Sequence, residues 1–481
     1  MVSPASDHEP EEESRGEDGE RRGQLGYQFF ARPVTRMSLS CNPGSTEWRY
    51  PAVRLELRGG NLPMTTPSGC PIAHGFDPLS DDYLADPYSV LNDLREIASV
   101  HYVPSLDYWV VTRYDDIAAI LTDPSTYSAS NAQAPFSTLT DEAQDILGRG
   151  LRNVPVLSSV DPPAHSRVRL PLAPLFLPRK VAKLQQRIEE LATRLIDDFA
   201  RMGRVDIVQA LTFPLPALTI FRLLGFPDEH AEQLKQWCGD KLEINWGRPD
   251  ADYQRRAATS VVKFWDYCER FVEIRAKSPG DDLTSRLLSR RETDDGVLSN
   301  REVASVIFGL SFAGHETTTN LIGNALRNLL SRPRLWQLLR EDPELVDSAI
   351  DETLRFDSSV ITWRRVTTRP VTIGGVDIPA NARLMLAFGA ANHDPRVFPE
   401  PEVFDIQREN ARAQLSFGKG IHFCLGTHLS KIEARTVLGM LTRRFPDLTL
   451  AEGQTVTYPR NITFRGPESL VVEWTPEGAS Q

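Results

Sequence analysis

The sequence predicts a mainly α-helical protein with small β-sheets. Apolar residues recur at three- and four-residue spacing along residues 184–202, over a charged face, which is typical of a helix with one buried side. Two short regions, 100–113 and 371–388, are rich in β-branched and aromatic residues, which favour strands. With 481 residues, of which 41% are hydrophobic, the chain can bury a large core.

The individual elements follow along the chain. A helix is predicted from Asp86-Pro87 to about Ile97, and a hairpin is predicted over 100–106 and 108–113. In the second strand region Gly374-Gly375 supplies the turn. The other helices that we expect begin at Asp161 or cover 184–202, 217–224, 229–237 and 254–277.

The segment 299–331 is predicted to form one long helix. Ser299 and Glu302 are spaced as a capping box, and Pro333 lies just beyond the end. The polar and β-branched residues of 313–318 interrupt its apolar sequence, and Thr hydroxyl groups compete for the carbonyl four residues back. This cluster could be an exposed polar patch, but the apolar runs on both sides favour a buried site at which the helix opens and bends.

The N-terminal part differs from the rest. Residues 1–22 contain eight acidic and three basic residues with almost no large apolar groups, a composition that favours disorder. Residues 23–63 remain rich in Gly, Pro and Arg. We expect residues 1–63 to be a disordered extension, or a stretch outside the natural reading frame if translation starts at Met64. Residues 64–481 then form one folded domain, because no repeat or linker divides them.

Composition excludes several classes of protein. The net charge of −11 argues against nucleic acid as a partner. Five widely spaced cysteines without a CxxC pair indicate neither a disulfide framework nor a zinc site, which is typical of a reducing, intracellular compartment. No apolar run approaches 18 residues and the N-terminus lacks a secretory pattern. These features predict a soluble, cytoplasmic protein that does not bind a membrane.

The most informative stretch is a cysteine-bearing loop, Phe-Gly-Lys-Gly-Ile-His-Phe-Cys-Leu-Gly, at residues 417–426. Its glycines permit backbone conformations that a Cβ would block, and apolar spacing after it predicts a helix with a buried side. A cysteine at the start of a helix lies near free N–H groups and the positive dipole end, which favour a thiolate able to bind a metal. A lone cysteine is more often a small core residue, and only the surrounding pattern changes that interpretation.

The pattern Phe-Gly-x-Gly-x-His-x-Cys-x-Gly resembles the haem-ligating loop of the cytochromes P-450. The resemblance covers about residues 67–474 and implies a single-domain cytochrome P-450 fold that holds haem b between the long helix and the helix after the loop. It also implies that the Cys424 thiolate is the proximal ligand of the iron. The other loop positions that match cofactor-binding residues are Phe417, Gly418, His422 and Gly426.

The cluster within the long helix resembles the oxygen-activating groove of the same family. Cleavage of an O–O bond requires protons in a mostly dry pocket, so that a hydroxyl must position water and a carboxylate must resupply protons. The resemblance assigns the hydroxyl to Thr317 and the carboxylate to Glu316. Ala313 and Gly314 would leave space for O₂ and the porphyrin.

Two further groups of residues resemble conserved parts of that family. Glu352, Arg355 and Arg408 match its Glu-Arg-Arg cluster, which would brace the thiolate loop, although an acid and a base three residues apart usually form only an exposed ion pair. Cationic partners for the haem propionates are implied at His165, Arg169, Arg365 and His422. Arg364 is an alternative to Arg365, and Pro171 is a departure that would end or kink the helix containing His165 early.

The resemblance implies a monooxygenase that inserts one atom of O₂ into a small hydrophobic organic substrate. Electrons would come from a separate ferredoxin and a ferredoxin reductase that uses NAD(P)H, with Lys419, Lys431 and Arg435 as candidate docking charges. Alternatives are a peroxygenase, a coupling enzyme, an isomerase or a non-catalytic haem sensor. The expected substrate pocket is predominantly apolar and is formed by 130–157, 215–246, 308–312, 360–362 and 463–464.

Overall fold

The computed structural model describes residues 70–151, 156–289 and 298–476. By contacts the chain divides into Met1–Pro51 and Ala52–Gln481, and every described residue belongs to the second unit. The expected extension 1–63 and the expected domain start at Met64 therefore lie outside the described residues. None of the helices in the described ranges combines the length and the apolar character needed to cross a bilayer.

Helices dominate the described part of the chain. The α-helices are α1 (Asp81–Ala85), α2 (Pro87–Ile97), α3 (Tyr114–Thr122), α4 (Asp141–Gly150), α5 (Ala164–Leu172), α6 (Pro178–Val181), α7 (Gln185–Phe199), α8 (Pro214–Leu224), α9 (Ala231–Trp246), α10 (Ala251–Lys277), α11 (Leu283–Ser289), α12 (Asn300–Ala313), α13 (Glu316–Leu330), α14 (Pro333–Glu341), α15 (Val346–Phe356), α16 (Phe388–Asn392) and α17 (Thr427–Arg444).

The strands are short and fall into three groups among the described residues. They are β1 (Val100–Val103), β2 (Tyr108–Val111), β3 (Tyr127–Ser128), β4 (Arg204–Asp206), β5 (Trp363–Thr367), β6 (Val371–Ile373), β7 (Val376–Ile378), β8 (Arg383–Leu386), β9 (Thr449–Leu450) and β10 (Val471–Glu473). The largest sheet has the order β1-β2-β8-β5-β3, and the smaller ones are β4-β10-β9 and β6-β7. In the largest sheet β2 and β8 run parallel and the other pairs are antiparallel.

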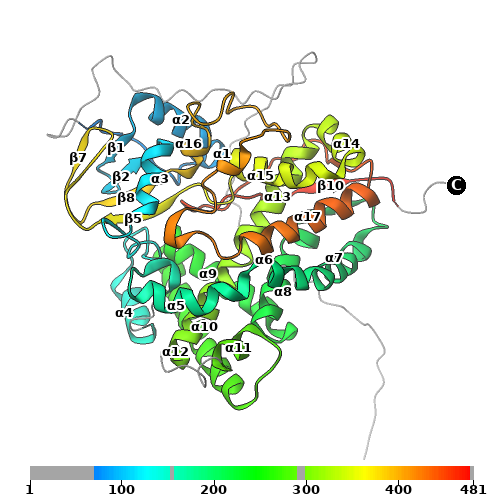
Figure 1. Ribbon diagram of the computed structural model, residues 1–481, viewed down its shortest axis with the longest axis horizontal. Helices are drawn as coiled ribbons and strands as arrows, with labels where there is room; N and C mark the ends of the chain where they lie inside the picture. Colours follow the sequence, from blue (N-terminus) through cyan, green and yellow to red (C-terminus); the bar gives the residue numbers. More distant parts are fainter. Residues whose placement is uncertain (1–69, 152–155, 290–297, 477–481) are drawn as a thin grey trace, which may run out of the picture. The chain divides into compact units, whose positions relative to one another are not determined.

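Two large apolar cores among the described residues support these elements, beside a small third cluster between α4, α9 and α10. One joins the largest sheet to α8, α9, α10 and α12, and the other lies among α7, α13, α15 and α17. Helices α13, α15 and α17 pack against one another, whereas α2, α3 and α16 lie beside the largest sheet (Figure 1). Because α17 follows the cysteine loop directly, the second core fixes the position of that loop.

The predicted elements agree closely with the observed ones. The helix over 86–97 is α2, the hairpin over 100–113 is β1 and β2, and Gly374-Gly375 turns between β6 and β7. The helix expected at 229–237 instead continues to Trp246 as part of α9. Pro171 lies inside α5, which ends one residue later at Leu172.

The expected long helix is interrupted. The capping box of Ser299 and Glu302 is present, but α12 ends at Ala313 and α13 begins at Glu316. The Thr317 Oγ1 donates to the Ala313 carbonyl at 3.1 Å, and the His315 Nδ1 lies 3.1 Å from the carbonyl of Ser311. Side chains therefore take carbonyls that a continuous helix would use, which is the effect that the polar cluster predicts.

A buried ion cluster joins the end of α15 to distant parts of the chain. The Asp357 carboxylate is fully buried and accepts hydrogen bonds from Arg327 at 2.6 Å, Tyr88 at 2.9 Å, Asn328 at 3.1 Å and Arg465 at 3.3 Å. Although burial raises the pKa of Asp357, the charges of Arg327 and Arg465 outweigh burial and lower the pKa to about 2. The cluster ties α2, α13 and the C-terminal segment to α15.

We expect Asp357→Asn to lower the free energy of unfolding by about 3–5 kcal/mol at pH 7, because two guanidinium groups lose their buried counter-charge. The folded pKa lies below the unfolded value of about 3.9, so the contribution is present above pH 4 and is lost as the pH falls towards 2. Urea unfolding at pH 7 and pH 3 would measure both effects. Asp266→Asn, at an exposed position of α10, is the control, and an equal loss in both variants would contradict the account.

Candidate functional site

The cysteine loop has a tightly constrained backbone. The Cys424 N–H donates to the Phe417 carbonyl at 2.9 Å, which closes the loop immediately before α17. Gly420 has a φ of +71°, and a Cβ there would lie 2.4 Å from the Leu121 carbonyl oxygen. Gly418 also has a positive φ, +69°. Only glycine suits position 420, because both its dihedral angle and its surroundings exclude a side chain.

Cys424 lies exposed at the end of this loop. Desolvation by the surrounding protein raises the pKa of its thiol, while the N–H groups of Gly426 and Thr427 and the charge of Arg169 act in the opposite direction. The N–H groups at the start of α17 thus lower the pKa of the thiol, as the sequence predicts, while desolvation raises it by more when no metal is bound. A coordinating metal ion removes that proton outright.

The described residues contain no site at which three or more His, Cys, Asp or Glu side chains could hold a metal ion together. A metal bound at the loop would therefore have Cys424 as its single ligand from these residue types. Cys70, Cys238 and Cys268 are buried and belong to the first core. Burial raises the pKa of each of these thiols, which makes them inert as nucleophiles or ligands. Cys424 is the exposed thiol among the described cysteines.

Four basic side chains gather beside the loop. The Arg169 Nη2 donates to the Phe423 carbonyl at 2.6 Å, and the rings of His165 and His422 lie 4.4 Å apart. Arg365 is buried, and its Nη1 donates to a backbone carbonyl, that of Arg364. The structure thus brings together all four side chains that the resemblance selects, from α5, β5 and the loop itself.

The electrostatics of this group indicate that anionic partners belong there. Burial lowers the pKa of Arg365 to about 10, and burial together with the charge of Arg365 lowers the pKa of His422 to about 3. The Nε2 atoms of His165 and His422 are buried without a hydrogen-bond partner among the described residues. The nearby Asp161 accepts hydrogen bonds from Ser128 and the Ala129 N–H. The group therefore has unused donors and an excess of positive charge.

The candidate proton-delivery residues lie where α12 and α13 meet. Burial raises the pKa of Glu316 to about 7, an effect that Glu243 adds to and Asn320 opposes, so this carboxyl is half protonated near neutrality. Its side chain is 15% exposed, and Thr317 is half-buried. An acid and an alcohol poised in this way suit proton transfer at pH 7.

Ala313 and Gly314 have different surroundings. Ala313 is exposed, as expected of a residue that borders an open space. At Gly314 a Cβ would lie 2.5 Å from the Ile220 side chain of α8. Glycine at 314 therefore permits close packing of α8 against the helix junction, a role that the sequence pattern did not indicate.

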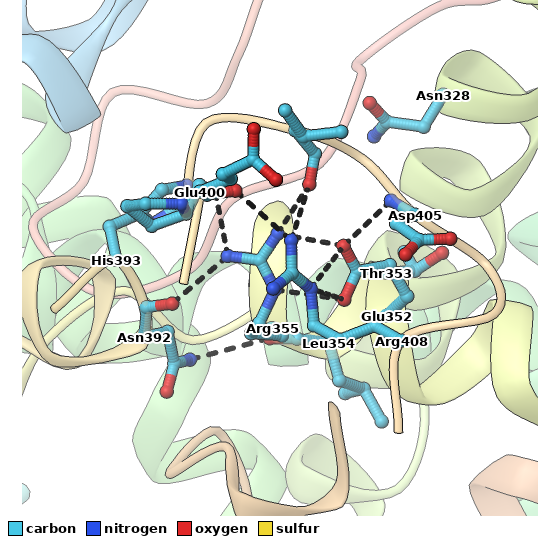
Figure 2. Close-up of polar contacts among 12 residues, drawn as sticks. Asn328, Glu352, Thr353, Leu354, Arg355, Asn392, His393, Glu400, Asp405 and Arg408 are labelled. Carbon is cyan, nitrogen blue, oxygen red and sulfur yellow. Dashed lines mark hydrogen bonds and ion pairs between the residues drawn. The ribbon is translucent and has the colours of Figure 1, made fainter. Parts of the chain in front are cut away.

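Glu352, Arg355 and Arg408 form the expected buried cluster (Figure 2). The two Glu352 oxygens accept from Arg355 at 2.7 and 2.8 Å, and Arg408 lies 3.2 Å from the same carboxylate. The two guanidinium groups also donate to backbone carbonyls of the segment before the cysteine loop, namely those of Asn392, Pro399, Glu400, Pro401 and Val403.

The same segment connects α15 directly to the cysteine loop. Asn392 accepts from the Leu415 N–H at 2.8 Å and donates to the Ser416 Oγ at 2.9 Å. Ser416 in turn donates to the Leu354 carbonyl at 2.6 Å. Because residues 415 and 416 immediately precede Phe417, the Glu352 cluster holds the backbone from which the cysteine loop starts.

Residues of the expected substrate pocket come together at α12. Trp246 of α9 stacks on Phe312 of α12, with ring centroids 5.1 Å apart, and contacts Phe464. Lys241, one turn earlier in α9, is 3% exposed and lies among these rings. Sequence reasoning missed Lys241. Its helical spacing with the apolar residues Leu234 and Cys238 would have placed it on the buried side of the helix.

The chain is similar in sequence to proteins of one family. The family model described as Cytochrome P-450 matches residues 251–465. The 6-deoxyerythronolide B hydroxylase of Saccharopolyspora erythraea is 36% identical, over 82% of this chain and 97% of the hydroxylase. The vitamin D(3) 25-hydroxylase of Pseudonocardia autotrophica is 35% identical, over 78% of this chain and 90% of that enzyme.

A solved structure shares the fold. The cytochrome P-450 CREJ, in complex with (4-ethylphenyl) dihydrogen phosphate, superposes with a TM-score of 0.80 at 35% identity, over 84% of this chain and all of that one. The predicted fold class, a mainly α single-domain cytochrome P-450 fold, is thus confirmed. The chain belongs to the cytochrome P-450 family and is a haem-thiolate monooxygenase whose cofactor is haem b.

Proposed function

We propose that this enzyme inserts one atom of O₂ into a small hydrophobic substrate, using electrons that separate redox proteins deliver. The observation that carries the proposal is the group of four basic side chains beside an exposed cysteine. Haem b has two propionates, which supply the acceptors and the negative charge that His165, Arg169, Arg365 and His422 lack. The residues present therefore fit the cofactor.

In this proposal each part of the loop has a separate task. The sulfur of Cys424 would hold the haem iron, and the positive φ of Gly418 lets the backbone turn within the loop. A Cβ at position 426 would lie 3.7 Å from this sulfur, so that Gly426 leaves the space beside it open. When bound, the haem supplies the oxidising chemistry that activates O₂. The carbonyl of Phe417 accepts a hydrogen bond from the Cys424 N–H and so fixes the loop backbone.

Glu316 and Thr317 move protons. The carboxyl of Glu316 has a pKa of about 7, so that it can both release a proton and be recharged at neutral pH. The hydroxyl of Thr317 remains anchored to the Ala313 carbonyl and positions water beside the reacting centre. This pair favours O₂-dependent oxygenation over peroxide-driven or isomerase chemistry, which needs no proton supply of this kind.

The substrate proposal rests on the apolar rings of the pocket and on the relatives. The two similar hydroxylases are named for 6-deoxyerythronolide B and for vitamin D(3). Phe308, Phe312 and Phe464 supply aromatic faces in the corresponding region of this chain. We infer an apolar substrate body that packs against these faces.

The candidate docking charges differ in their surroundings. Lys431 pairs with Asp351 and Arg435 pairs with Asp347, both acids of α15. Lys419 is exposed in the cysteine loop. The acids offset much of the expected positive charge, so that a ferredoxin partner would depend chiefly on shape and on Lys419.

Turnover assays would test the proposed function. We expect product from a panel of small apolar compounds when the purified enzyme receives NAD(P)H, a ferredoxin and a ferredoxin reductase, and little product with hydrogen peroxide alone. Equal or greater product with peroxide alone would instead favour a peroxygenase. The absence of product under both conditions, with compounds that bind, would contradict a monooxygenase function.

A further inference from the structure

Lys241 is a charged side chain in a position where charge is unusual. It is 3% exposed, and its Nζ lies 4.7, 5.2 and 5.5 Å from the ring centroids of Phe312, Trp246 and Phe308. The amide oxygen of Gln133 accepts a hydrogen bond from this Nζ at 2.7 Å. A lysine ammonium can donate three hydrogen bonds, so that two remain available.

Among the described residues the side-chain partner of the Lys241 Nζ is the Gln133 amide, and no carboxylate charge contributes to its pKa. Burial lowers the pKa of Lys241 to about 8, so the ammonium form still predominates at neutral pH. The faces of three aromatic rings attract the cation, but they do not accept its hydrogen bonds as an oxyanion would. A buried charge without a counter-charge is costly to fold, which points to a partner outside the chain.

Neighbouring groups also supply donors and positive charge. The Nε1 of Trp246 is buried without a hydrogen-bond partner among the described residues. Arg364, which is 1% exposed, donates to the carbonyls of Ala132 and Asn245, next to Gln133 and Trp246 in the sequence. Two cations and an unused indole N–H thus lie where the 130–133 segment meets the end of α9.

The position of this group relates it to the proposed reaction. Trp246 stacks on Phe312, and Phe312 immediately precedes the exposed Ala313 at the end of α12. A molecule held at Lys241 would therefore extend along the aromatic rings towards Ala313 and Thr317. We propose that Lys241 and the indole N–H of Trp246 bind an oxyanion, a carboxylate or a phosphate, at one end of an apolar substrate.

This inference rests on the proposed function and names its substrate class: apolar acids. Such a molecule places its charged end at α9 and its apolar body against the rings. The Lys241 ammonium would form an ion pair with an oxyanion, which also accepts the Trp246 N–H, whereas a neutral analogue of the same shape offers an acceptor but no counter-charge. Discrimination then follows from the buried ammonium, which a neutral ligand leaves without a counter-charge.

Equilibrium binding to the haem-loaded protein tests the inference. The probes are 4-butylbenzoate, 4-butylphenyl phosphate and the neutral 4-butylbenzamide. The affinity of each probe is measured by calorimetry and from the shift of the Soret band. We expect at least one oxyanion to bind about tenfold or more tightly than the amide. The comparison of the two oxyanions identifies which of them the site prefers.

Variants test which residues cause the preference for oxyanions over the amide. Lys241→Met should bring the oxyanion and the amide to similar affinities, and Lys241→Arg should keep the preference. Trp246→Phe, which keeps an aromatic ring but removes the indole N–H, should reduce the ratio of oxyanion to amide affinity. Lys235→Met is the matched control, since Lys235 lies on the same helix and pairs with Glu232. That control should bind all three probes as the wild type does.

Three results would overturn the inference: amide binding as tight as that of both oxyanions, no oxyanion binding at all, or an unchanged preference in Lys241→Met. If Lys241→Met does not retain haem, the inference is tested by the ratio of oxyanion to amide affinity in the wild type and by the change of that ratio in Trp246→Phe. These measurements use no electrons, so that they remain informative if turnover fails. Conversely, an enzyme that turns over neutral compounds without an oxyanion preference contradicts only the inference on Lys241.

Discussion

Glu352→Ala is expected to yield protein that folds poorly and does not retain haem. The substitution removes the carboxylate that Arg355 and Arg408 share, and the Arg355 side chain has no exposed surface. Leaving buried guanidinium groups without their counter-charge costs about 3–5 kcal/mol. The loss falls on the segment that supports Leu415 and Ser416, so that the cysteine loop loses its anchor. Haem content per purified chain, from the Soret absorbance, measures the effect.

Glu344→Ala is the matched control, because Glu344 is exposed just before α15. It should retain haem as the wild type does. Glu352→Gln should give an intermediate result, since an amide keeps some hydrogen bonds but no charge. Normal haem content in Glu352→Ala would show that the cluster does not support the cofactor site.

Thr317→Ala is expected to uncouple electron consumption from product formation. Without the hydroxyl, water beside the reacting centre is no longer positioned, and the carboxyl of Glu316 loses its route for delivering protons. Product per NAD(P)H should fall by about tenfold or more, while NAD(P)H is still consumed. Product yield and NAD(P)H oxidation, measured in the same reaction, give the ratio.

Thr317→Ser provides the control for packing. It keeps the hydroxyl and loses only the methyl group, so that coupling should remain close to that of the wild type. If Thr317→Ala also remains coupled, the hydroxyl is not part of proton delivery. If both variants are uncoupled, the side chain acts through its shape rather than through its hydroxyl group.

Much of the fold could be predicted because its signals are local. The caps of α12, the hairpin of β1 and β2 and the glycine turn before β7 depend on residues close together in the sequence. The cysteine loop could also be predicted, because any residue with a Cβ at position 420 would clash with the Leu121 carbonyl. The glycine in the loop motif is therefore a steric requirement of the fold.

The features that sequence did not predict depend on contacts between distant segments. The partners of Asp357 come from α2, α13 and the C-terminal segment, and no spacing rule connects them. The pKa of the Cys424 thiol depends on desolvation by the whole fold as well as on the local N–H groups at the start of α17. Gly314 is required by α8, almost a hundred residues earlier. Lysine is usually a surface residue, and the helical spacing of Lys241 with Leu234 and Cys238 is the one local sign that it is buried.

The account depends most directly on the sulfur of Cys424 as the ligand of the haem iron. The decisive measurement is the spectrum of the reduced, carbon monoxide-bound protein, for the wild type and for Cys424→Ser. We predict the strongly red-shifted Soret band of a thiolate-ligated haem in the wild type and its loss in Cys424→Ser, together with loss of much of the haem. An unchanged spectrum in the variant would contradict the account.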